Sequence, residues 1–157
     1  MAVKPIPEGY HSLQTYLAVE DASKAIEFYK EAFGAEENVR MPGPDGKVAH
    51  AELQIGDSKL MLSDPFPHSN VRPPSERGGP TGSVFMYVDD VDATFEQAQH
   101  AGAEVVSELE DMFWGDRFGT LSDPFGHVWS VATHKEDLSE EEMAERSKAA
   151  MAEMGAG

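Results

Sequence analysis

The sequence predicts an α+β fold built from two tandem βαβββ modules followed by a C-terminal helix. A strand, a helix and three further strands are indicated twice, on either side of a proline-rich segment. Short sequences recur at almost the same offset, since Gly34-Ala35-Glu36 returns as Gly102-Ala103-Glu104 and Val19-Glu20-Asp21 returns as Val88-Asp89-Asp90. This self-similarity indicates a duplicated supersecondary unit.

The first module is expected over about residues 12–64. Its opening strand is indicated by alternation, in which Leu13, Thr15, Leu17 and Val19 alternate with Gln14, Tyr16 and Ala18. A helix then begins at Asp21, a residue type favoured as an N-cap, and ends at Gly34. Three strands are predicted to follow at residues 35–41, 47–56 and 58–63, separated by turns rich in glycine and proline.

A linker of about residues 65–80 contains five prolines and shows neither strand nor helix periodicity. The second module, about residues 81–134, repeats the first pattern. A strand is indicated by Val84, Met86 and Val88, and a helix begins at Asp90 or Asp92 and ends at Gly102. Strands are then predicted near residues 103–109, 116–122 and 127–134.

A C-terminal helical tail is predicted over residues 139–154. Ser139 and Glu142 have the spacing of a capping box. Four apolar residues then form one helical stripe: Met143, Ala150, Met151 and Met154. Such a tail is either a latch packed on the body or on a second subunit, or a lid over a ligand cleft.

Composition excludes several classes of function. A length of 157 residues suits a single domain covering 1–157, and a net charge of -17 disfavours nucleic acids and anionic membranes as partners. The chain has no cysteine, which rules out thiolate chemistry and disulfides. No apolar run is long enough to cross a bilayer. We therefore expect an acidic, cytoplasmic protein, whose charge serves solubility or attracts a cationic ligand.

Three motifs carry a resemblance to a known family. They are Ala51-Glu52-Leu53-Gln54-Ile55-Gly56-Asp57, Trp114-Gly115-Asp116-Arg117-Phe118-Gly119 and Asp123-Pro124-Phe125-Gly126-His127-Val128-Trp129. With the two modules, they make residues 12–134 resemble the vicinal oxygen chelate superfamily, and within it an uncharacterised glyoxalase-like bacterial subgroup. That superfamily includes glyoxalase I, extradiol dioxygenases, fosfomycin-modifying enzymes and bleomycin-sequestering proteins. The resemblance implies curved mixed sheets around a ligand cleft, helices on the outer face and a homodimer.

The resemblance also implies four positions for the ligands of a divalent metal. In this sequence they are Gln14, Met61, Ser83 and Ser130. Only Gln14 offers a donor of the usual kind, because a thioether and two serine hydroxyls are poor substitutes for histidine and glutamate. No metal or other cofactor is therefore predicted. If a divalent metal is bound, the expected ligands are Gln14, His50 and Glu52.

Strand alternation allows the cleft side of the sheets to be predicted without the metal. Leu53 and Ile55 should face the first helix, which leaves His50, Glu52 and Gln54 on the opposite face. The expected ligand-binding residues are Gln14, Tyr16, His50, Glu52, Gln54, Met61, Phe85, Tyr87, Trp114, Asp116, Arg117, Phe118 and Ser130. His50 and Glu52 are also the catalytic candidates, but a hydrogen-bonded polar pair lining a wet cleft is the favoured interpretation, because no nucleophile or second acid lies nearby in the sequence.

The segment Trp114–Phe118 has two interpretations. Trp114 and Phe118 could supply a stacking surface, and Arg117 a bidentate anchor for a ligand carboxylate or phosphate. Alternatively, these residues are core aromatics beside an ordinary salt bridge.

Three functions are compatible with the sequence, so whether the chain is an enzyme stays open. The first, which the missing metal ligands favour, is a small-molecule binder with a degenerate metal site, and a cationic or aromatic ligand would fit its acidic charge and aromatic face. The second is a metal-dependent lyase, isomerase or dioxygenase that uses Gln14, His50 and Glu52. The third is a structural protein whose cleft is vestigial.

Overall fold

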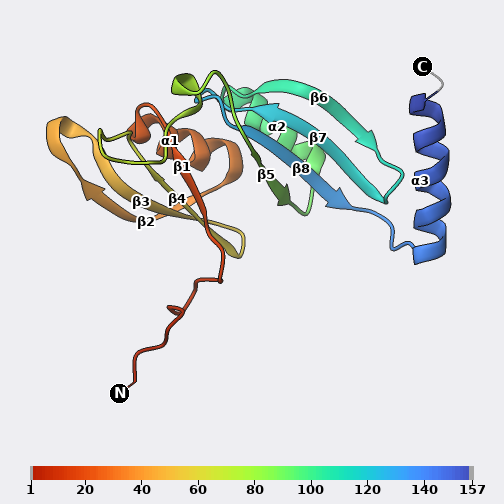
Figure 1. Cartoon of the computed structure of the whole chain (residues 1–157), viewed down its shortest axis with the longest axis horizontal. Helices are drawn as coiled ribbons and strands as arrows, with labels where there is room; N and C mark the ends of the chain where they lie inside the picture. The colour runs from red at the N-terminus through yellow and green to blue at the C-terminus, as the bar shows by residue number, and fades with distance from the viewer. Residues whose placement is uncertain (1, 156–157) are drawn as a thin grey trace.

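The computed structural model describes residues 2–155 and contains two similar halves (Figure 1). Each half has one helix and one four-stranded sheet. The first half comprises β1 (Thr15–Ala18), α1 (Ala22–Phe33), β2 (Glu36–Pro42), β3 (Val48–Ile55) and β4 (Ser58–Ser63). The second comprises β5 (Ser83–Tyr87), α2 (Val91–Ala101), β6 (Glu104–Asp111), β7 (Asp116–Ser122) and β8 (Val128–His134), and α3 (Glu140–Gly155) follows. The predicted α+β class and tandem βαβββ modules are confirmed.

Both sheets are mixed and have the same topology. The strand orders are β1-β4-β3-β2 and β5-β8-β7-β6, with the first strand of each module parallel to the last and the other pairs antiparallel. Tyr16 pairs with Met61 in the first sheet, and Phe85 pairs with Ser130 at the equivalent place in the second. The repeat seen in the sequence is therefore a repeat of sheet register.

Local capping explains where the two helices begin and end. The side chain of Asp21 accepts a hydrogen bond from the amide of Lys24, and that of Asp90 accepts one from Ala93. Asp90 rather than Asp92 is thus the N-cap of α2. Gly34 and Gly102 end the helices with φ of 66° and 119°, the left-handed conformation that glycine adopts without steric cost.

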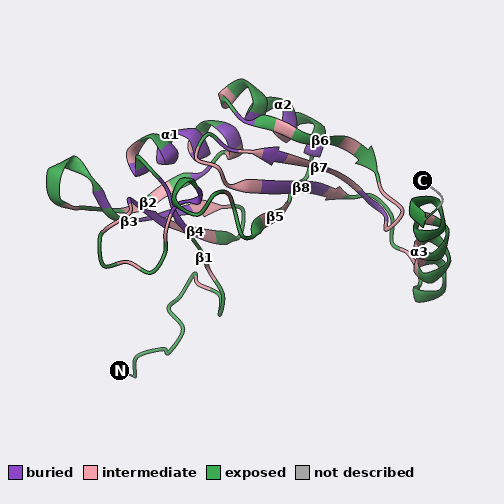
Figure 2. Cartoon of the chain, turned by 45° about the horizontal axis from the view of Figure 1, so that its top comes forward, coloured by how far each residue is buried: buried purple, intermediate pink, exposed green. Residues whose placement is uncertain are grey.

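The two modules pack through their helices and a group of aromatic rings. α1 and α2 lie side by side on the same side of the molecule, each against one face of its own sheet (Figures 1 and 2). The Trp129 ring of β8 lies 4.6 Å from Phe33 and 5.3 Å from Tyr29 on α1, measured between ring centroids. A single hydrophobic cluster includes residues of both modules. The predicted core position of Trp129 is therefore correct.

A buried carboxylate organises this contact between modules. Asp123 Oδ1 accepts hydrogen bonds from the amides of Phe125 and His127, both at 2.9 Å. Its Oδ2 accepts from the Tyr29 hydroxyl at 2.6 Å and from Trp129 Nε1 at 2.9 Å. Asp123 thus closes the turn before β8 and joins it to α1. Burial and the neighbouring carboxylate of Asp123 raise the pKa of Tyr29 well above its usual value.

Two parts of the sequence pattern differ from the structure. Leu13 was expected to share the buried face of the first strand, but its exposed fraction is 88% because β1 begins only at Thr15. The predicted tail helix is present, and Ser139 and Glu142 exchange the two hydrogen bonds of the capping box. However, none of its residues is buried, and it lies beyond the ends of β6 and β7 (Figure 1).

Polar contacts connect the tail helix to the body. Arg146 forms an ion pair with Glu136 at 2.7 Å and donates to the carbonyl of Phe113. Within residues 2–155, the helices are all too short or too polar to cross a membrane.

Tyr29→Phe should lower the free energy of unfolding by about 1–3 kcal/mol, because it removes one donor from the buried Asp123. Urea denaturation followed by circular dichroism measures this change. Tyr16→Phe, which removes a hydroxyl from an exposed ring, is the control and should change stability by less than about 0.5 kcal/mol. Equal losses in the two variants would contradict the role assigned to Asp123.

Candidate functional site

The faces of the two sheets opposite α1 and α2 form what we call the open face. In β3, Ala51 and Leu53 are fully buried towards α1, so His50, Glu52 and Gln54 lie on the open face. In β7, Gly119 packs against Phe95 of α2, which places Phe118 on the open face and Arg117 on the helix side. Alternation in each strand therefore decides which side chains can meet a ligand.

On the first module, the open face carries a chain of polar side chains centred on Glu52. Glu52 accepts hydrogen bonds from the Tyr10 hydroxyl and from His50 Nε2, the latter at 3.1 Å. His50 Nδ1 lies 3.1 Å from the Tyr16 hydroxyl. Because a carboxylate only accepts, Nε2 carries the ring hydrogen and the tyrosine donates to Nδ1. The arrangement fixes the tautomer of His50.

Glu52 is ionised in this position. The hydrogen bond from Tyr10, followed by that from His50, holds the pKa of Glu52 below its usual value, although its exposed fraction is only 8%. Tyr10 was not predicted from the sequence as a site residue. It precedes the first strand in a segment without periodicity, so no pattern indicated that it folds back onto the sheet.

The second module has a cluster of aromatic rings on its open face. Phe85 stacks on Phe118 with ring centroids 5.7 Å apart, and Trp114 meets Phe118 edge to face at 5.6 Å. Tyr87 lies 5.1 Å from Phe85. Phe85 and Tyr87 are exposed by 50% and 61%, so much of this aromatic surface contacts solvent. The structure brings these four predicted residues together.

Asp116 holds the aromatic cluster in place from below. It is 2% exposed and accepts hydrogen bonds from the Tyr87 hydroxyl and Trp114 Nε1, both at 2.9 Å. His134 Nδ1 lies 2.8 Å from its other oxygen. Burial would raise the pKa of Asp116, but the bonds from His134, Tyr87 and Trp114 outweigh burial and keep the pKa below its usual value. Asp116 therefore orients the rings.

A groove of about 830 Å³ runs between the modules and meets the aromatic cluster. Phe85 and Tyr87 form part of its wall on β5, and the β3–β4 hairpin forms the opposite side. Its charged residues are Asp57, Lys59, Asp89 and Asp90. We call this the inter-module groove. Its lining combines aromatic surface with an excess of negative charge.

Other predicted site residues lie elsewhere or are already bonded. Arg117 forms ion pairs with Asp92 at 3.0 Å and Asp111 at 3.3 Å on the helix side of its sheet. The Gln14 amide donates to the carbonyl of His11, and that of Gln54 donates to Gly56. Met61, which pairs with Tyr16, is half-buried, and Ser130, which pairs with Phe85, is buried.

The residues at the four positions expected for metal ligands do not fit a divalent metal ion. Met61 and Ser130 occupy equivalent places in the two sheets. Gln14 directly precedes β1, and Ser83 is the first residue of β5. These donors are a thioether, two hydroxyls and an amide, which do not match a divalent ion that prefers imidazole and carboxylate. In residues 2–155, no three histidine, aspartate or glutamate side chains gather closely enough to hold a metal.

The fold and site define a class of protein: two βαβββ modules whose open faces carry polar and aromatic side chains. The family model described as "Glyoxalase/Bleomycin resistance protein/Dioxygenase superfamily" matches residues 11–131, and the chain belongs to this family.

Known proteins match most of the chain in sequence or in structure. An uncharacterised protein of Mycobacterium bovis is 43% identical, covering 93% of this chain and 95% of its own. TioX from Micromonospora sp. ML1 is 28% identical with a TM-score of 0.63, covering 82% of this chain and 100% of its own. TnmS3, an antibiotic binding protein from Streptomyces sp. CB03234, is 28% identical with a TM-score of 0.62, covering 86% of this chain and 99% of its own.

The His134–Asp116 contact should make stability depend on pH. Hydrogen bonds to Asp116 and then Asp137 raise the pKa of His134 above 6.5, so its charged form is favoured in the folded state. This contribution is complete below the unfolded pKa and is lost as pH rises through the raised value. We expect His134→Asn to reduce stability more at about pH 6 than at about pH 8.

Urea denaturation of both proteins at each pH measures this difference. His100→Asn, a substitution at an exposed histidine of α2, is the control and should leave the pH dependence as it is in the unaltered protein. A loss of stability in His134→Asn that is the same at both pH values would contradict the assignment.

Proposed function

We propose that the protein binds a small aromatic molecule on the aromatic cluster of the second module and in the adjoining inter-module groove. The observation that carries this proposal is the half-exposed pair Phe85 and Tyr87, of which Phe85 stacks on Phe118 and Tyr87 is held by its hydrogen bond to Asp116. A large apolar surface left open to water is costly unless a partner covers it. A planar ligand stacking on these rings would bury it.

The hydrogen bonds beneath the rings favour tight binding. Tyr87 and Trp114 both donate to Asp116, so their orientations are set before a ligand arrives. Rings that are already oriented lose little conformational entropy on binding. Offset stacked or edge-to-face contacts with aromatic rings contribute about 0.5–1.5 kcal/mol each beyond the area they bury. The site is thus preorganised for a flat ligand.

The charge around the groove favours a cationic ligand. Asp57, Asp89 and Asp90 line the groove against a single lysine, Lys59, whose ammonium group is hydrogen-bonded to Asn38 at 2.6 Å. The net charge of -17 adds a long-range attraction for cations. TnmS3, which shares the fold, is described as an antibiotic binding protein, and this supports a role in binding a small molecule.

Binding can be tested with proflavine, a planar cation, and 1-anilinonaphthalene-8-sulfonate, an aromatic anion. Fluorescence titration should show saturable binding of the cation with higher affinity. Phe85→Ala should weaken proflavine binding about tenfold, equivalent to roughly 1.4 kcal/mol, because a stacking surface is lost. Phe66→Ala, which removes a phenyl ring from the linker, is the matched control and should leave binding unchanged.

Three results would count against the proposal. They are the absence of saturable binding, a preference for the anion, and equal losses in Phe85→Ala and Phe66→Ala. The last of these would indicate a general effect on the fold.

A second candidate function is favoured by one observation, the ordered Tyr16–His50–Glu52 chain on the first module. Gln14, His50 and Glu52 would there serve a metal-dependent lyase, isomerase or dioxygenase. Metal analysis of protein purified without chelator tests this. Stoichiometric nickel, zinc, manganese or iron that is lost in Glu52→Ala would replace the binding proposal with this one.

We also propose that the protein is a homodimer, as its family resemblance implies. Exposed apolar side chains on the outer strands support this, namely Met41 on β2 and Val106 on β6. Light scattering after size exclusion should give about twice the chain mass of 17.1 kDa. The chain mass itself would contradict a stable dimer.

A further inference from the structure

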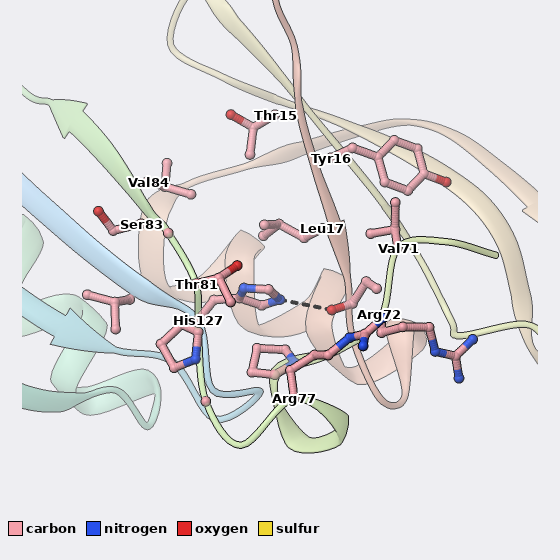
Figure 3. Close-up of a pocket in the computed structure, with 16 residues that line it drawn as sticks. Thr15, Tyr16, Leu17, Val71, Arg72, Arg77, Thr81, Ser83, Val84 and His127 are labelled. Atoms are coloured by element: carbon pink, nitrogen blue, oxygen red, sulfur yellow. Dashed lines mark hydrogen bonds between the residues drawn. The ribbon is translucent and has the colours of Figure 1, made fainter.

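A pocket separate from the aromatic cluster lies at the seam between the two modules. Its volume is about 290 Å³, close to the lower limit for small-molecule sites. β1 forms one wall, β5 and the beginning of β8 form another, and the linker crosses beside them (Figure 3). We call it the seam pocket. It shares only Thr15 and Val84 with the lining of the inter-module groove.

The charge of the seam pocket is opposite to that of the protein. Its lining includes Arg72, Arg77 and His127, and none of the residues that line it is an aspartate or glutamate. The whole chain has 29 acidic residues against 12 lysines and arginines. An anion would therefore meet less repulsion here than in the inter-module groove, which is lined by three aspartates.

The two arginines are in different electrostatic situations. Arg72 forms a bidentate pair with Glu76, at 2.6 and 2.8 Å, and donates to the carbonyl of Phe66. The carboxylate of Glu76 balances the charge of Arg72, and the bond to Phe66 joins two parts of the linker. For Arg77, no hydrogen bond or ion pair of the side chain is found within residues 2–155. In Figure 3 Arg77 extends along the pocket from the linker, whereas the guanidinium of Arg72 points outwards.

His127 contributes to the wall rather than to the charge. Its Nε2 lies 2.8 Å from the carbonyl oxygen of Ala18. A carbonyl oxygen only accepts, so Nε2 carries the hydrogen and the ring ties the turn before β8 to β1. Thr81, on the linker, offers a neutral hydroxyl donor beside the pocket, and Ser83 lines the pocket at the start of β5 (Figure 3).

We propose that the seam pocket binds a small oxyanion, the carboxylate or phosphate group of a small molecule. Arg77 supplies the charge, since its planar guanidinium matches two oxygens of either group. Thr81 supplies a neutral hydroxyl donor from the linker. The ligand would contact the linker and the second module beside β1 and would occupy a site distinct from the aromatic cluster.

Inorganic phosphate and malonate are the probes, titrated at constant ionic strength with sodium chloride into the full chain. Isothermal calorimetry measures affinity, and amide chemical shifts of Thr81 and Ser83 locate the site. Arg77→Gln should weaken binding about tenfold or more, because one charge-assisted contact is lost. Arg77→Lys keeps the charge and should retain part of the affinity. Lys148→Gln, which removes the same charge from the tail helix, should bind as the unaltered protein does.

The two probes separate the sources of the oxyanion. Saturable binding of phosphate alone assigns a phosphate group, and binding of malonate alone assigns a carboxylate. The proposal is overturned if neither anion saturates, if Arg77→Gln and Lys148→Gln lose affinity equally, or if the amides of Thr81 and Ser83 do not shift. Because Arg77 is exposed, its substitution should leave the circular dichroism spectrum unchanged.

Discussion

The arrangement of the two modules depends on the buried carboxylate of Asp123. Each module contains its own sheet and its own helix caps, but Asp123 accepts hydrogen bonds from Tyr29 of the first module and from Trp129 of the second. Its other oxygen is occupied by the amides of its own turn. A buried carboxylate with all its acceptor sites used is costly to separate from any one partner. The position of α1 against the turn before β8 is therefore closely defined, and with it the distance between β1 and β5.

The two open faces have become different although the modules share one topology. Tyr16 and Phe85 occupy equivalent positions in register, as do Met61 and Ser130. Around them, the first module has assembled a polar chain on Glu52, and the second has assembled rings above Asp116. In both cases an ionised carboxylate receives hydrogen bonds from aromatic side chains. The polar chain on Glu52 is open to solvent at Tyr16, which is 40% exposed. Asp116 is only 2% exposed, because the aromatic rings that it orients cover it.

Sequence periodicity predicted the helices and strands and, for most strands, which side chains point to which face of the sheet. It failed where the residues of a strand do not alternate between apolar and polar. β3 was assigned correctly because Leu53 is apolar and its neighbours are polar. β7 was ambiguous because Arg117 and Phe118 both suit an open face, yet the small Gly119 packed under Phe95 places Arg117 on the helix side. Tyr10 and the role of Asp116 could not be predicted, since both depend on contacts between distant segments. Such contacts follow from packing and not from local spacing.

The linker shows how an acidic chain can keep one positive site. Glu76 lies between the two arginines in sequence, and both of its carboxylate oxygens accept hydrogen bonds from Arg72. That pairing is favoured by the bidentate geometry and by the bond from Arg72 to Phe66, which holds the guanidinium where Glu76 can reach it. Arg77 follows immediately after the short helix formed by Pro74–Glu76 and extends along the seam instead. Pro73 and Pro74, both buried, lie at the start of this short helix, and Arg77 at its end lines the seam pocket.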